Sequence, residues 1–90
     1  IFDAIAKEVA KINFDYAIVE ISPTNTIKIK LQLINENILV ISKPLGVVDD
    51  LDSNDVIFSV FEEKNLLLSG SANIQKLATS INDYSSASNN

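Results

Sequence analysis

The stretch "TIKIKLQL", residues 26–33, alternates polar and apolar side chains without a break. Successive side chains of a strand point to opposite faces of a sheet, so this period of two predicts a strand with one buried face and one wetter face. The positions between the aliphatic residues hold Thr, Lys or Gln, which suit the wetter face. The residues expected to point into the core are Ile27, Ile29, Leu31 and Leu33.

Two further strands are predicted on either side of this one. Residues 14–22, "FDYAIVEIS", end before Pro23, which cannot donate a hydrogen bond to a neighbouring strand and favours turns. Residues 38–42, "ILVIS", follow the polar turn "NEN" and end before Pro44. Connections this short join antiparallel neighbours, so the three strands are expected to follow one another as a meander.

Two more strands and two helices complete the expected order. The runs 55–61, "DVIFSVF", and 66–70, "LLLSG", predict a second hairpin. Residues 1–12 and 74–81 carry aliphatic side chains at helical spacing and predict an amphipathic helix at each end. The predicted fold is therefore α+β: a five-stranded antiparallel meander sheet with the N-terminal and C-terminal helices packed on one face.

Length and composition limit the number of domains. Ninety residues, 47% of them apolar and 21% charged, suffice for one small domain with a single core and are too few for two. We expect one domain over residues 1–84 and a flexible tail over residues 85–90, "SSASNN".

Neither a membrane span nor a secretory signal is visible in the sequence. No uncharged run approaches the roughly 18 apolar residues that a transmembrane helix needs, and we expect a cytoplasmic protein without membrane contact. The sequence begins at Ile1 and contains no Met, which indicates a trimmed, processed or excised segment.

The residue types that are missing exclude several kinds of chemistry. The sequence has no His, Cys, Trp, Met or Arg. Without Cys there is no thiolate nucleophile or zinc ribbon, and without His the usual general base near neutral pH is absent. Gly46 and Gly70 stand alone, so no glycine-rich phosphate loop is present, and Glu62 and Glu63 are adjacent in a predicted turn, where they point apart. We therefore expect no enzyme activity, no catalytic residue and no cofactor.

The stretch "GVVDDLDSNDV", residues 46–56, has the oxygen-rich composition of a cation site. It superficially resembles the calcium loop of EF-hand proteins, because Asp50, Asp52 and Asn54 match the first three ligand positions of that loop. A solvated turn has the same composition, since Asp, Asn and Ser side chains replace missing backbone hydrogen bonds in turns.

The remaining positions of the EF-hand loop do not match. The glycine required at the sixth position is Asp55 here, and the bidentate glutamate required at the twelfth position is Phe61. The predicted flanking elements are strands rather than helices. We prefer the solvated turn and expect no metal site. A low-affinity calcium or small-ligand site in the acidic loop 49–55 is kept as the alternative function.

The lengths of the first two turns predict which side chains share a face of the sheet. A three-residue loop, 23–25, places Val19 beside Ile29, and a turn centred between Asn35 and Glu36 fixes the next strand. The face opposite the helices then gathers three of the seven lysines among aromatic and aliphatic side chains. The residues predicted to form this partner-binding face are Tyr16, Ile18, Lys28, Lys30, Leu39, Ile41 and Lys43.

An uncovered sheet face with apolar side chains predicts an association function. Exposed apolar patches larger than roughly a few hundred Å² mark interfaces, and two short helices cover about one face of the sheet. We expect a non-catalytic interaction or accessory module of the chaperone, immunity or regulatory-subunit type. It is expected to associate with itself through this sheet face, most simply as a homodimer, or to bind one specific protein. A net charge of −5 repels nucleic acid, so no nucleic-acid partner is expected. A strongly curled sheet that buries both of its faces is the open alternative.

Overall fold

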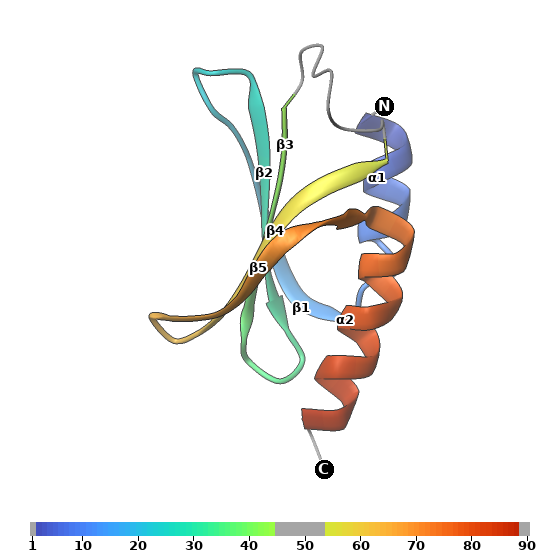
Figure 1. The fold of residues 1–90 in the computed structure, drawn as a ribbon, viewed down its shortest axis with the longest axis vertical. Helices are drawn as coiled ribbons and strands as arrows, with labels where there is room; N and C mark the ends of the chain where they lie inside the picture. The colour runs from blue at the N-terminus through green and yellow to red at the C-terminus, as the bar shows by residue number, and fades with distance from the viewer. Residues whose placement is uncertain (1, 45–53, 89–90) are drawn as a thin grey trace.

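The computed structural model describes residues 2–44 and 54–88, and in them an antiparallel sheet is flanked in sequence by two helices (Figure 1). Helix α1 (Phe2–Val9) precedes the sheet and helix α2 (Ile74–Ser88) follows it. In the sheet, neighbours in space are neighbours in sequence, which confirms the predicted α+β meander. Its strands are β1 (Phe14–Ile21), β2 (Thr26–Leu33), β3 (Ile38–Pro44), β4 (Asp55–Glu62) and β5 (Asn65–Asn73).

Both helices lie on the same side of the twisted sheet (Figure 1), which we call the helix side; the opposite side is the open side. One apolar core fills the space between the helices and the sheet, because each helix buries its apolar stripe there. The strands that contribute buried residues to this core are β2, β3 and β4. β1 and β5, the two outer strands, contribute none.

The hairpin between β1 and β2 agrees with its prediction. The Ser22 N–H donates to the Thr26 carbonyl oxygen at 2.9 Å, so the loop consists of residues 23–25. Asn25, its last residue, has a φ of 58°, a left-handed conformation that asparagine tolerates well. This loop places Val19 opposite Ile29, as expected.

The hairpin between β2 and β3 differs from its prediction by one residue. The Leu33 N–H donates to the Asn37 carbonyl oxygen at 2.9 Å, so the loop consists of the three residues 34–36 instead of the two-residue turn centred between Asn35 and Glu36. Glu36 has a φ of 74° at the position where such loops usually carry Gly or Asn, so the polar turn "NEN" does not reveal the length of this loop.

The changed loop moves every side chain of β3 to the other face of the sheet, because side chains alternate along a strand. Leu31 pairs with Leu39 instead of Val40. Leu39, Ile41 and Lys43 therefore lie on the helix side, where they are 0%, 1% and 8% exposed. The prediction that these three residues lie on the open side is wrong.

The helices also differ from the expected bounds. α1 ends at Val9, and a tight turn follows in which the Ile12 N–H donates to the Val9 carbonyl oxygen at 3.0 Å. α2 continues to Ser88, and Ser85 is fully buried, so the boundary expected at residue 84 falls inside the helix. The assignment of one domain and the flexibility of the tail stay predictions. Among the described residues, no helix combines the length and the apolar character needed to cross a membrane.

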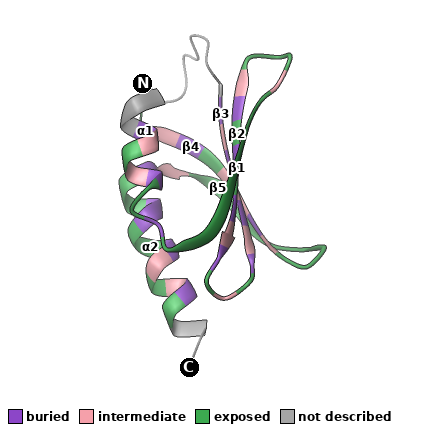
Figure 2. Cartoon of the chain, turned by 180° about the vertical axis from the view of Figure 1, so that it is seen from behind, coloured by how far each residue is buried: buried purple, intermediate pink, exposed green. Residues whose placement is uncertain are grey.

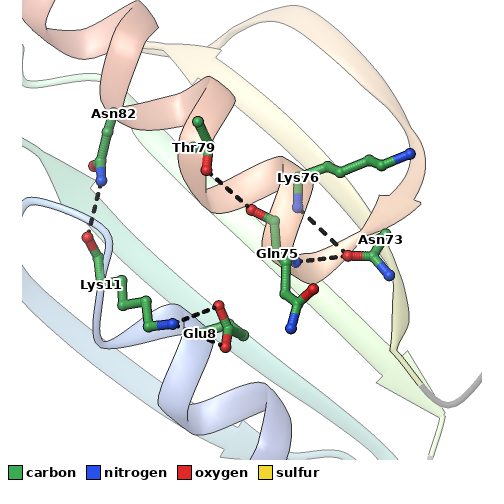
Figure 3. Close-up of polar contacts among 7 residues, drawn as sticks. All are labelled: Glu8, Lys11, Asn73, Gln75, Lys76, Thr79 and Asn82. Atoms are coloured by element: carbon green, nitrogen blue, oxygen red, sulfur yellow. Dashed lines mark hydrogen bonds and ion pairs between the residues drawn. The ribbon is translucent and has the colours of Figure 1, made fainter.

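Side-chain hydrogen bonds hold the start and the middle of α2 in place (Figure 3). Asn73 caps the helix, since its Oδ1 accepts from the Gln75 N–H at 2.9 Å. The Asn82 Nδ2 donates to the Lys11 carbonyl oxygen at 2.9 Å, and the Asn82 Oδ1 accepts from the Asn13 N–H at 2.8 Å. Asn82 thus ties α2 to the segment that leads from α1 into β1.

Candidate association surface

The seven residues predicted to form one partner-binding face lie on both sides of the sheet. Four of them occupy the open side, where β1 and β2 present Tyr16, Ile18, Lys28 and Lys30. In this group Ile18 stands opposite Lys30, as predicted, and the two lysines are exposed. Partner binding by these four residues stays a prediction.

The other three residues belong to the interior. Leu39 and Ile41 are part of the core. The Lys43 Nζ donates to the backbone carbonyl oxygen of Asp55, which holds the lysine head against the start of β4. These three side chains are therefore covered on the helix side in this structure, and their part in partner binding stays a prediction.

In the observed register of β3 against β2, different residues of β3 lie on the open side. Ile38 and Val40 of β3 replace the three core residues, and Phe61 of β4 stands opposite Ile38. A hollow of about 210 Å³ lies there, and Lys30 and Glu63 also line it. All three apolar residues are half-buried. Sequence reasoning missed them because it placed the β2–β3 turn one residue off.

β1 is the most exposed apolar element in the described part of the chain. All eight of its residues are exposed (Figure 2). Tyr16 and Ile18 on the open side are 46% and 45% exposed, and Val19 and Ile21 on the helix side are 55% and 67% exposed. Val19 and Ile21 face the same side as the core but lie beyond the area that the helices cover. β1 therefore presents apolar side chains on both of its faces.

The backbone of β1 also has one open edge. β1 is the first strand of the sheet and pairs only with β2 among the described strands. The pairing of β1 with β2 has a bulge between Phe14 and Tyr16, but it is regular from Tyr16 to Ile21, and this segment contains neither Pro nor Lys. Natural proteins protect an outer strand with those devices, because unpaired N–H and C=O groups bind further strands.

β5, at the opposite edge, differs from β1. Leu66, Leu67 and Leu68 are 55%, 50% and 57% exposed, but a bulge interrupts the pairing between β4 and β5 at this point. The second half of the strand, 69–73, holds only Ser, Gly, Ala and Asn. Bulges and small polar residues make this edge a poorer template for strand pairing.

The acidic loop 49–55 is the alternative ligand site that the sequence predicts. Residues 45–53, which include Asp50 and Asp52, lie outside the described residues. Within the residues that the structure does describe, no group of three or more His, Cys, Asp or Glu side chains could hold a metal ion. The calcium alternative for the loop 49–55 stays a prediction.

Among the described residues, the exposed apolar surfaces thus include the open side of the sheet, the outer edge of β1 and the leucines of β5. No family model, curated protein or solved structure matches the chain, so the functional conclusion depends on these surfaces alone.

Proposed function

We propose that the chain is a non-catalytic association module that pairs with a second copy of itself through the outer edge of β1. The observation that supports this proposal is the exposure of all eight β1 residues at a sheet edge that is regular from Tyr16 to Ile21. In such a dimer, β1 of each copy becomes an interior strand of a sheet that runs through both copies.

The composition of β1 suits an interior strand. Strands that are buried on both faces carry nearly continuous apolar runs, whereas strands with one wet face alternate. The segment "YAIVEI", residues 16–21, holds one charged residue, Glu20, while β2 alternates regularly. A second copy would cover apolar side chains on both faces of β1 and satisfy the backbone groups along its edge.

The charges along β1 are compatible with a two-fold pairing. Asp15 and Glu20 are its only charged residues, and Glu20 stands opposite Lys28 of the same chain. In an antiparallel pairing centred on Ile18, no acidic residue faces another one directly, so the repulsion between like charges that destabilises cross-strand pairs is avoided.

The molar mass in solution, measured by sedimentation equilibrium up to high micromolar concentration, tests this proposal. We expect the native chain to approach the mass of a dimer and the Val19→Lys variant to remain a monomer at the same concentrations, because a lysine on an edge strand opposes further pairing. Val19 is 55% exposed, so the variant should fold.

The matched control is Ile57→Lys. Ile57 is 45% exposed, lies on the open side and belongs to β4, away from the β1 edge. We expect this variant to dimerise like the native chain. Loss of the dimer in Ile57→Lys but not in Val19→Lys would show association through the open side and overturn the β1 proposal. A native chain that is monomeric at every concentration would overturn it as well.

A further inference from the structure

A second exposed feature, an apolar groove, lies between α2 and the β4–β5 hairpin on the helix side, and the proposed association does not use it. Its volume is about 380 Å³. One wall comes from the two strands and the other from the helix. The apolar residues that form these walls are Phe58, Val60, Leu67, Leu68, Leu77 and Ile81.

The bulge in β5 explains why the strand wall is so apolar. Val60 pairs with Leu68 and Phe61 pairs with Leu66, so Leu67 has no direct partner in β4. Side chains of consecutive residues normally point to opposite faces of a sheet, but a bulge redirects them, and both Leu67 and Leu68 line the groove. About half of each side chain remains exposed to water, at 50% and 57%.

The polar groups of the groove lie along α2. Lys76, Ser80 and Tyr84 follow one another at intervals of four residues, so they form a single stripe on the helix. Tyr84 is engaged by the hairpin between β2 and β3, because the Asn37 Nδ2 donates a hydrogen bond to its hydroxyl oxygen. The stripe therefore has a cation at one end and a hydrogen-bonded hydroxyl at the other.

Lys76 supplies the only charge among the described residues that line the groove. Its side chain is exposed and extends away from the side chains of Asn73 and Gln75, which flank it at the start of α2 (Figure 3). A cation beside an apolar cleft selects for a ligand that combines an apolar body with a negative group.

We infer that the groove binds a free medium-chain carboxylate, with its aliphatic chain along the leucines and its carboxylate at Lys76. A volume of about 380 Å³ lies near the lower end of small-molecule sites, which span about 300–1,000 Å³, and suits a chain of medium length. The charge of Lys76 complements the carboxylate, and the apolar walls complement the chain.

Isothermal titration calorimetry with octanoate, decanoate and neutral decanol tests this inference. Burial of each methylene group increases affinity about fourfold, so decanoate should bind about 15-fold more tightly than octanoate. We expect one saturable decanoate site per chain, and decanoate should bind more tightly than decanol because decanol carries no charge.

Variants separate the charge from the apolar walls. Lys76→Gln should lower the affinity for decanoate by up to about fivefold, the range of an exposed ion pair, and leave the affinity for decanol unchanged. Leu68→Ser should lower the affinity for both ligands, because it removes part of the apolar wall. Leu68 is 57% exposed, so the variant should still fold. Lys7→Gln is the matched control for charge, because Lys7 is an exposed lysine of α1, and it should bind both ligands like the native chain.

Two outcomes would overturn the inference. One is the absence of saturable decanoate binding in a chain that is folded by circular dichroism. The other is a native chain that binds decanol as tightly as decanoate, with no effect of Lys76→Gln, since the cation would then not select the ligand. Val19→Lys, the β1 variant, should bind decanoate normally because β1 and β5 lie at opposite edges of the sheet. The failure of one proposal is therefore distinguishable from the failure of the other.

Discussion

β1 and β3 both pair antiparallel with β2, but their surroundings differ sharply. Val19 of β1 and Leu39 of β3 both point to the helix side, opposite Ile29 and Leu31 of β2. Leu39 is 0% exposed and Val19 is 55% exposed. Both side chains are aliphatic, so the difference comes from what covers them. Coverage by the helices, rather than the apolar character of a strand, therefore decides which residues form the core.

The largest expected effect in this comparison is at the centre of β3. Leu39→Ala should lower the free energy of unfolding by about 2–5 kcal/mol, because it opens a cavity in a fully buried position. Its neighbour Val40 lies half-buried on the open side, so Val40→Ala should cost about 1 kcal/mol. Urea unfolding of both variants gives the two values. A larger cost for Val40→Ala would contradict the register of β3.

A smaller loss of stability is expected from a substitution near the start of β1. Asn82→Ala removes the hydrogen bonds that Asn82 makes with the backbone of Lys11 and Asn13, and it should destabilise the chain by about 1–2 kcal/mol. The adjacent and exposed Asp83 serves as the control, and Asp83→Ala should change stability by less than about 0.5 kcal/mol. Equal effects of the two variants in urea unfolding would show that Asn82 does not anchor the entry into β1.

In the two hairpin loops next to β2, we expect one substitution to raise the stability of the chain rather than lower it. Glu36→Gly should stabilise the chain by about 0.5–1 kcal/mol, because glycine adopts the left-handed conformation of this position without the steric cost that glutamate bears. Asn25→Gly should change stability by only a few tenths of a kcal/mol, since asparagine already tolerates that conformation. Melting temperatures report both shifts. A lower melting temperature for Glu36→Gly would contradict the three-residue β2–β3 loop.

The smallest expected effect is at the exposed apolar face of β1. Val19→Thr should change the stability of the monomer by less than about 0.5 kcal/mol, as measured at concentrations too low for association. Ile29, opposite Val19, is buried, and Ile29→Thr should cost about 2 kcal/mol or more because it places a hydroxyl in the core. Similar costs at both positions would show that β1 is covered within one chain.

The sequence predicted the candidate site only in part. The exposure of Tyr16 and Ile18 on the open side followed from the loop 23–25, whose turn residues are recognisable. Ile38 and Val40 were missed, because the turn signal before β3 is ambiguous and a shift of one residue exchanges the faces of a strand. The groove beside α2 was missed because its walls come from a bulged strand and a helix, and no local pattern shows how they meet.

Local patterns in the sequence were enough to predict the order of the elements, the antiparallel meander and the buried face of β2. These features depend on local periodicity and on short connections, which act over a few residues. Which apolar residues are covered depends instead on how the helices pack on the sheet. The helices cover the strands in the middle of the sheet and leave β1 and the leucines of β5 exposed. The physical reason is that burial depends on the layer that packs against a strand, and that layer comes from distant parts of the chain.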